Sequence, residues 1–214
     1  MKALGFIVGV LVFWLLSALA SAQFDPQAAV PADIREQYRN QDGSCVYCSI
    51  GMMGVDMNNP NAASILHDSE YGQACRGGAW PQRVIEDFQR RGIDAWHVEG
   101  NTKEWLQWCW RNGRTAAVTL TPYHMQWCVG FDTNSVYVVD NNSPQKVDEW
   151  SHSSFWRQHE AHDGGWAVIL KGPRPASWVP PERFPWWEGL RNAKQAKTVG
   201  AVGYDPAGIP GGQR

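Results

Sequence analysis

Apolar residues recur at helical spacing in the first half of the chain. Residues 81–92 show the pattern best, because apolar side chains lie one turn apart, Pro81 stands at the start and Gly92 follows as a stop signal. The same reasoning predicts further helices at residues 48–57, 61–70 and 102–113.

In the second half the apolar runs become short and are separated by turn residues. They predict strands at residues 115–121, 124–131, 136–140 and 164–170, with a helix at 150–162 before the last strand. The turn DTNS, residues 132–135, indicates a hairpin between two of these strands. Helices followed by an antiparallel sheet predict an α+β domain, with a helical N-terminal half and a sheet in the C-terminal half.

The two ends of the chain differ from the middle. Residues 1–22 have the form of a secretory signal peptide, with Lys2 ahead of an apolar run and Ala20-Ser21-Ala22 at its end. We therefore expect an exported protein, secreted or periplasmic, that is not held in a membrane after cleavage. The rest divides into a lead-in at 23–36, one compact domain at 37–172 and a Pro/Gly-rich, partly disordered tail at 173–214.

The formal net charge of −2 gives no electrostatic basis for binding nucleic acid. The stretch NQDGSCVYCSIGMMG, residues 40–54, is more informative because it holds Cys45 and Cys48 in C-x-x-C spacing. A structural zinc site needs a second ligand pair, and no other cysteine of this chain has a partner nearby, so we expect no metal. A thioredoxin-like dithiol follows a strand, whereas polar residues precede this one.

An odd number of cysteines, five in this chain, leaves one thiol unpaired in an exported protein. That thiol is either an inert buried side chain or a reactive one. An apolar helical stretch follows Cys48, and the positive end of a helix dipole lowers a thiol pKa. Gln41, a few residues upstream, is a potential amide donor.

A cysteine nucleophile needs a base, usually histidine. His124 stands apart from the other histidines because it directly precedes an apolar strand of the predicted hairpin. If Asp132 pairs with Ser135, Asn141 becomes the diagonal neighbour of His124 on the same face, where its side-chain carbonyl would orient the imidazole. Asp140 replaces Asn141 if the loop has one residue more or fewer.

Several segments resemble the papain-like cysteine peptidases. NQDGSCVYCS at 40–49 resembles their active-site segment N-Q-G-x-C-G-x-C-W, with one extra residue after the glutamine. Similar segments follow in the family order, at 71–93, 124–132, 136–143 and 164–170. The resemblance implies a papain-like fold and a cysteine peptidase or amide hydrolase that acts on polypeptides without a cofactor.

The resemblance also assigns roles. It gives the nucleophile, the base, the orienting amide and the oxyanion-hole donor as Cys48, His124, Asn141 and Gln41. It implies a disulfide between Cys45 and Cys75, and a Cys109–Cys128 pair would then leave Cys48 free.

The chain departs from the papain-like pattern at Ser49, where the family has tryptophan, and at Val46, where it has glycine. These departures keep two alternatives open: a catalytically inactive binding module, and a Cys–His acyl transferase of the transglutaminase-like kind. The chain also resembles, in part, the bacteriocin-processing cysteine peptidases, whose order Q…C…H…D would make Cys45 the nucleophile and Asp140 the third member.

Overall fold

The computed structural model describes residues 30–172 with the exception of 42, 68–77, 101, 113, 122 and 162–164. The predicted signal peptide, most of the lead-in, the C-terminal tail and Cys75 therefore lie outside the described residues. Within the described part of the chain, no helix combines the length and the hydropathy that crossing a bilayer requires.

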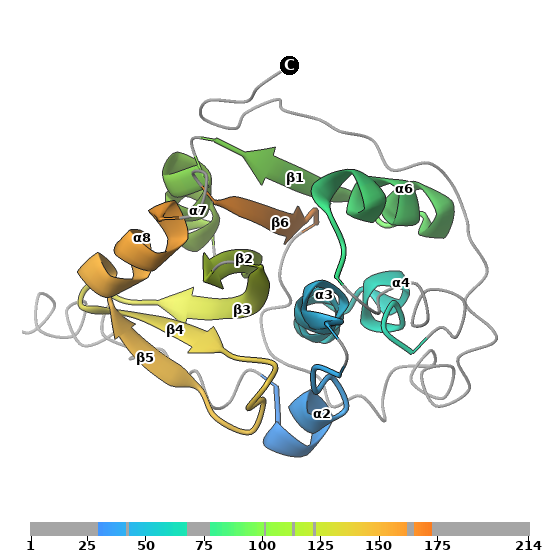
Figure 1. Cartoon of the computed structure of the whole chain (residues 1–214), viewed down its shortest axis with the longest axis horizontal. Coiled ribbons are helices and arrows are strands. Elements are labelled where there is room, and N and C mark those ends of the chain that lie inside the picture. The colour runs from blue at the N-terminus through green and yellow to red at the C-terminus, as the bar shows by residue number, and fades with distance from the viewer. Residues whose placement is uncertain are drawn as a thin grey trace, which may run out of the picture.

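The strands form one 6-stranded antiparallel sheet in the order β1-β6-β2-β3-β4-β5 (Figure 1). Their bounds are β1 (Ala95–Glu99), β2 (Ala116–Thr121), β3 (His124–Phe131), β4 (Ser135–Val139), β5 (Asp148–Ser151) and β6 (Trp166–Leu170). The sequence predicted β2, β3, β4 and β6. It missed β1 and β5, whose short sequences AWHVE and DEWS lack a clear apolar run.

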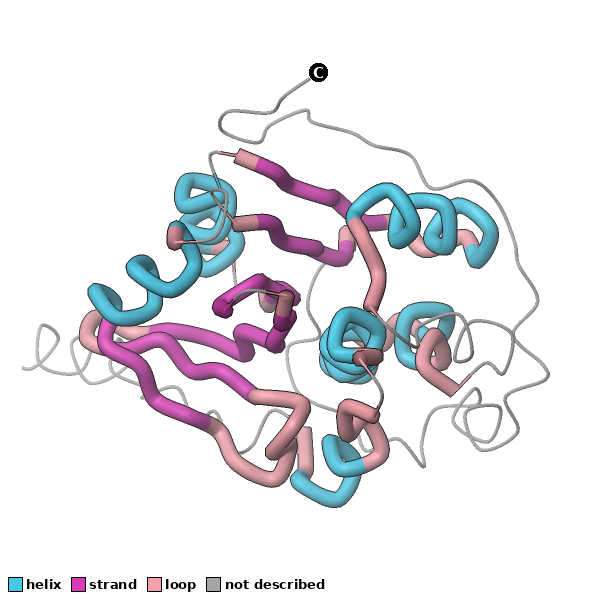
Figure 2. Tube along the Cα trace, in the orientation of Figure 1, coloured by secondary structure: helices cyan, strands magenta, loops and turns pink. Residues whose placement is uncertain are grey.

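The helices lie on both faces of this sheet (Figures 1 and 2). Their bounds are α2 (Ala32–Glu36), α3 (Cys45–Asp56), α4 (Pro60–Ala63), α6 (Pro81–Arg91), α7 (Thr102–Arg111) and α8 (His152–Glu160). α6 matches its prediction and ends at Gly92, whose φ of 64° is the left-handed conformation that glycine adopts without strain. α4 covers the start of the helix expected at 61–70, residues 64–67 form a turn, and residues 68–70 lie outside the described residues. The mixture of helices and antiparallel sheet agrees with the predicted α+β class.

Two apolar cores result from this arrangement. α3, α4 and α6 contribute to one core, together with Met125 and Trp127 of β3 and Val139 of β4. α7 and α8 contribute to the other, together with Cys128 of β3 and Val138 of β4. Because neighbouring strand residues point to opposite faces, every strand except β5 supplies both cores, which explains the nearly continuous apolar runs of the other strands.

α3 is the central helix, and every one of its residues is buried. Its glycines let other backbone segments approach closely: a Cβ added at Gly54 would lie 2.3 Å from the backbone nitrogen of Ala63 in α4. A helix buried on all sides has no polar face, so the sequence pattern gave no sharp start. α3 begins at Cys45 rather than at the expected Cys48.

Candidate functional site

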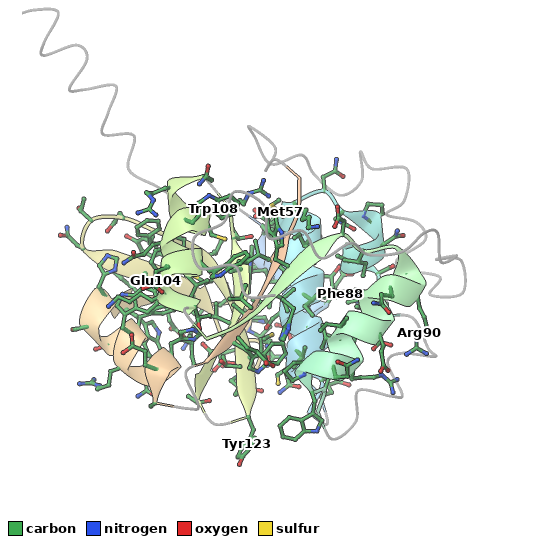
Figure 3. All side chains as sticks on the ribbon, turned by 90° about the horizontal axis from the view of Figure 1, so that it is seen from above. Met57, Phe88, Arg90, Glu104, Trp108 and Tyr123 are labelled. Carbon is green, nitrogen blue, oxygen red and sulfur yellow. The ribbon has the colours of Figure 1, made fainter. Side chains whose placement is uncertain are left out.

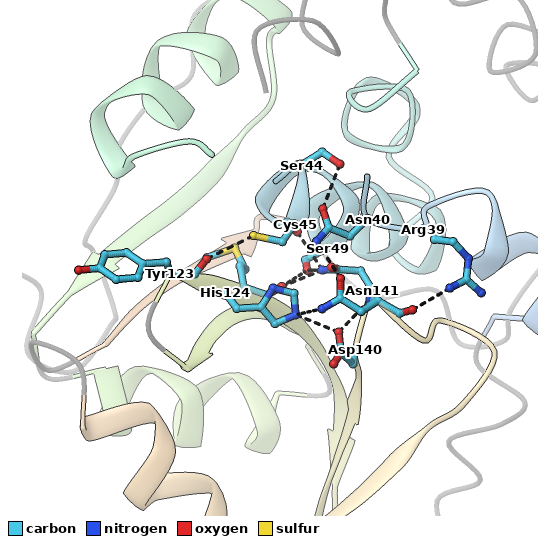
Figure 4. A network of polar contacts seen from close by, with 11 residues as sticks. Arg39, Asn40, Ser44, Cys45, Ser49, Tyr123, His124, Asp140 and Asn141 are labelled. Carbon is cyan, nitrogen blue, oxygen red and sulfur yellow. Dashed lines mark hydrogen bonds and ion pairs between the residues drawn. The ribbon is translucent and has the colours of Figure 1, made fainter. Parts of the chain in front are cut away.

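Polar side chains meet where the N-terminus of α3 reaches the start of β3 and the end of β4, two interior strands of the sheet (Figure 4). Cys45 is the first residue of α3, His124 begins β3, and Asp140 directly follows β4. The three come from segments far apart in the sequence, and the packing of α3 against β3 brings them together.

The thiol of Cys45 lies beside the imidazole of His124, and its Sγ is 3.8 Å from the backbone oxygen of Tyr123. Burial raises the pKa of the Cys45 thiol. The hydrogen bond to His124, the N–H groups of Met125 and Val46, and the positive charge of His124 together outweigh burial, so the pKa lies below its ordinary value. This environment favours the thiolate.

The imidazole of His124 lies between Cys45 and Asp140. Its Nε2 is 2.9 Å from Oδ1 of Asp140. Burial lowers the pKa of His124, but the hydrogen bonds and negative charges of Asp140 and Cys45 raise it to about 9. A lowered thiol pKa beside a raised imidazole pKa is the electrostatic condition for a thiolate–imidazolium pair.

Asp140 is oriented by a second contact. Its Oδ1 accepts a hydrogen bond of 2.8 Å from the backbone N–H of Asn142, and the side-chain amide of Asn142 lies 3.2 Å from His124 Nε2. Burial raises the pKa of the Asp140 carboxyl, but the bonds from His124 and Asn142 lower it below its ordinary value. Near neutral pH, Asp140 is therefore ionised while His124, with its raised pKa, is protonated.

The hairpin register decides which residue reaches His124. Near the turn, Asp132 N–H donates to Ser135 O and Gly130 pairs with Tyr137, as predicted. A β-bulge between Cys128 and Gly130 then shifts the pairing by one residue, so that Cys128 faces Val138.

Beyond the bulge, this one-residue shift changes which residues of β3 and β4 share a face of the sheet. His124 shares a face with Cys128, and Asp140 shares a face with Val138, because side chains alternate along a strand. The expectation that Asn141 would orient His124 is therefore wrong, and Asp140 takes that place.

Asn141 points to the other face, toward α3, and is fully buried. Its Nδ2 donates to the backbone oxygens of Cys45 at 3.0 Å and Met125 at 2.7 Å, and to Ser49 Oγ at 2.8 Å. Ser49 Oγ in turn donates to Met125 O at 3.1 Å. Asn141 and Ser49 thus bind the first turns of α3 to β3, which gives the buried Ser49 a structural role.

Cys48 lies one turn further along α3. A contact between Cys48 and His124 was expected, but the sulfur of Cys48 faces Ser44 instead. Its Sγ is 3.4 Å from Ser44 Oγ, and the residue is fully buried in the α3 core. Burial raises the pKa of the Cys48 thiol to about 12, and the negative charge of Cys45 adds to the rise. A neutral, enclosed thiol of this kind is a packing residue.

The expected disulfides are not formed by the described cysteines, because Cys45, Cys48, Cys109 and Cys128 are free thiols. Cys45 occupies the position beside His124 instead of a bridge, and Cys75 lies outside the described residues. Cys109 and Cys128 are buried together in the core beneath α7 and α8. Burial raises the pKa of both, so neither has thiolate character near neutral pH.

The loop before α3 carries Gln41, whose side chain is exposed. Ser44 closes this loop, since its N–H and hydroxyl both donate to the carbonyl of Gln41, at 3.3 and 2.9 Å. Asn40 joins the loop to the end of β4 through its N–H, which donates to Asn141 O at 2.7 Å, and its Nδ2, which donates to Asn142 Oδ1 at 2.9 Å. These bonds attach the loop that carries Gln41 to Asn141 and Asn142, the two residues after Asp140.

Sequence reasoning placed Gln41, His124 and the C-x-x-C in one site but missed Asn142. The only available signal was the run Asp140-Asn141-Asn142, in which the register selects the residue that faces His124.

No cluster of three or more histidine, cysteine or acidic side chains suited to a metal ion occurs in the described ranges.

Comparisons with models of known protein families and with curated proteins find no match for this chain.

Proposed function

We propose that the chain is a thiol-dependent amide hydrolase, a cysteine peptidase, with Cys45 as nucleophile, His124 as general base and Asp140 as the residue that orients His124. The observation that carries this proposal is the arrangement of three neighbouring side chains, in which the Cys45 thiol lies beside the imidazole of His124 and His124 Nε2 lies 2.9 Å from Asp140 Oδ1. A nucleophile, a base and an orienting group in this sequence of contacts form the general pattern of covalent acyl-transfer catalysis.

In the proposed reaction the thiolate of Cys45 attacks a substrate carbonyl carbon, and the C–S bond forms as the carbonyl π electrons move to oxygen. The intermediate collapses, the C–N bond breaks, and His124 gives its proton to the departing amine. Water then attacks the thioester, with His124 accepting its proton, and the acid leaves as Cys45 is restored. The pair needs no external oxidant, reductant or cofactor for these steps.

The oxyanion has two candidate donors. Backbone N–H groups in the first turn of a helix have no acceptor within the helix, and Cys45 occupies the first position of α3. The exposed side-chain amide of Gln41 is the second donor, from the loop that Ser44 closes. Each donor of this kind typically stabilises the transition state by about 3 kcal/mol.

The order Gln41, Cys45, His124, Asp140 is that of the bacteriocin-processing cysteine peptidases, the second of the two resemblances. It replaces the papain-like order, which needed Cys48 and Asn141. The intact contact chain also favours an active enzyme over an inactive binding module.

Thiol alkylation tests the proposal. Wild-type protein is treated with a limiting amount of iodoacetamide at about pH 6, where an ordinary thiol with a pKa of about 8.5 is almost fully protonated. Mass spectrometry of the digested protein then locates the label. We expect Cys45 to react at least tenfold faster than a free cysteine model compound, and Cys48 to remain unlabelled, because only Cys45 has thiolate character.

H124A supplies the matched variant, and we expect the rapid labelling of Cys45 to be lost in it. C48S is the control, and it should label like the wild type. The proposal fails if Cys45 in the wild type reacts no faster than the model thiol, or if the label appears on Cys48 of the native protein.

A further inference from the structure

A buried arginine binds the loop that begins with Asp140. This loop, residues 140–147, joins β4 to β5 and reaches α2 (Figures 1 and 2). Arg35 of α2 is 1% exposed, and its guanidinium donates to backbone carbonyls on both sides of it. These are Pro144 O at 2.7 Å, Gln145 O at 2.9 Å and Val30 O at 2.5 Å. Arg35 therefore attaches the loop to α2.

The position of this guanidinium is costly for the fold. Within the described residues its hydrogen-bond partners are carbonyl groups and no carboxylate forms an ion pair with it. Burial lowers the pKa of Arg35, because the charged form loses its water. A buried charge without an opposite charge costs free energy that an apolar side chain of similar volume does not. The carbonyl bonds, rather than a gain in stability, therefore account for an arginine at this position.

A second arginine binds the residue that contacts both Asp140 and His124. Arg39 follows α2, and its Nη1 donates to Asn142 O at 2.7 Å (Figure 4). The carboxylate of Glu36 accepts two hydrogen bonds from the same guanidinium, at 2.5 and 2.8 Å, and so fixes its direction. Asn142 in turn donates its N–H to Asp140 Oδ1 and places its amide 3.2 Å from His124 Nε2. The contacts thus lead from α2 to the imidazole.

The two sides of His124 differ in their access to solvent. Tyr123, which directly precedes His124, is 88% exposed and projects beyond the ribbon (Figure 3). Arg35 is enclosed within the fold, so a substrate cannot contact it. Any effect of an Arg35 substitution on the reaction must therefore pass through the loop that Arg35 holds.

We propose that Arg35 and Arg39 are positioning residues, which hold the loop so that Asp140 and the amide of Asn142 stay against His124. The bonds fix the carbonyls of residues 142, 144 and 145, and this limits where the first residue of the loop can lie. Without them the carbonyls take water as partners and the loop can leave α2. This inference rests on the proposed function, in which Asp140 orients His124.

The pKa of His124 separates positioning from a direct effect of charge. Hydrogen bonds and negative charges from Asp140 and Cys45 raise this pKa to about 9. If the arginines hold Asp140 in place, a neutral replacement lets the pKa of His124 fall toward its ordinary value of 6.5. A positive charge that acts only through space disfavours the imidazolium, so its removal would raise the pKa instead. The two explanations predict opposite directions.

Two measurements on R35M, R35K and R39M test the proposal. Histidine Cε1–Hε1 NMR signals give the pKa of His124, with H124Q to identify its signal. Release of p-nitrophenol from the p-nitrophenyl ester of benzyloxycarbonylglycine gives kcat and KM, with C45A as the blank. Circular dichroism and urea unfolding identify the variants that fold. R111A, at the exposed end of α7, is the matched control for loss of an arginine.

In R35M we expect the pKa of His124 to fall by about 1 pH unit or more and kcat to fall about tenfold, with KM unchanged within about twofold. R35K keeps the charge and some of the donors, so its values should lie between those of R35M and the wild type. R39M should show a smaller fall in both quantities, because the Arg39 side chain is 38% exposed. R111A should behave as the wild type.

The outcomes separate the two proposals. Release of p-nitrophenol that is the same in C45A as in the wild type contradicts the proposed function, and the NMR titration still tests the arginines. A pKa of His124 that stays unchanged or rises in folded R35M and R39M overturns the positioning role, even if both variants are less stable. If R35M does not fold, the direction of the shift in R39M decides. An equal fall in R111A also overturns the proposal.

Discussion

Cys45 and Cys48 are the same residue type one turn apart on one helix, and their environments oppose each other. Cys45 stands at the first position of α3 with His124 and backbone N–H groups around its sulfur, and its pKa is lowered. Cys48 lies one turn deeper in apolar surroundings, where burial raises its pKa to about 12. Position along the helix, and not the C-x-x-C spacing, therefore decides the chemistry of each thiol.

Asp140 and Asn141 form a second such pair, adjacent in sequence and opposite in direction. Asp140 faces His124 at 2.9 Å, whereas Asn141 is turned toward α3 and binds the carbonyls of Cys45 and Met125. Asp140 places a negative charge beside His124, whereas Asn141 holds α3 against β3. Substitutions can separate these roles.

The largest contrast is expected between D140A and N141A. Removing Asp140 takes away the group that orients and charges His124, so kcat for hydrolysis of the p-nitrophenyl ester should fall about 10²- to 10⁴-fold. The stability of D140A in urea should differ little from that of the wild type, because the Asp140 side chain is 28% exposed. N141A should lose about 2–4 kcal/mol of unfolding free energy, because buried carbonyls lose their donor.

The same two assays check this contrast by measuring both variants under conditions where each is folded. If N141A loses kcat as strongly as D140A while remaining folded, Asn141 takes part in the chemistry and the division between the two residues is incorrect. N142A provides an exposed neighbour for comparison, with an effect on kcat between those of the other two.

The pH profile should show an intermediate effect. The proposed mechanism requires the Cys45 thiolate and the His124 imidazolium together, so kcat/KM should rise as Cys45 ionises below its ordinary pKa and fall as His124 loses its proton at about 9. Because Asp140 is among the groups that raise the His124 pKa, D140N should move the alkaline limb to lower pH.

The raised pKa of His124 should also make the stability of the fold depend on pH. His124 has a folded pKa above its ordinary value of 6.5, so its contribution to stability is complete below that value and is lost as pH rises through about 9. Urea unfolding across this interval measures it, with H124Q as the variant that lacks the titration. An alkaline limb that D140N leaves in place would show that another group sets it.

The smallest effect is expected from C48A. Removing the buried sulfur leaves a small cavity and should cost about 1–2 kcal/mol of unfolding free energy, with kcat of the folded enzyme unchanged within about twofold. C45A, in contrast, should abolish ester hydrolysis with a smaller loss of stability, because Cys45 lies at the helix end. A large loss of kcat in C48A would restore Cys48 to the reaction.

Local patterns predicted those parts of the fold that depend on local signals. α6 carries its apolar period, its proline and its terminal glycine within its own residues, and the hairpin around residues 132–135 carries its turn. β1 and β5 were missed because their pairing with β6 and β4 is made by residues far away in the sequence or on the exposed edge of the sheet. The start of α3 was predicted three residues too late because the helix is buried on all sides, so no polar face marks where it begins.

The sequence by itself determined the α+β class, the pairing of a thiol segment with His124, and the short list from which the site is drawn. Only the tertiary structure selected Cys45 over Cys48 and Asp140 over Asn141. The physical reason is the same in both cases. The depth at which α3 meets the sheet sets which sulfur reaches the imidazole, and one bulged residue between Cys128 and Gly130 sets which side chain faces it.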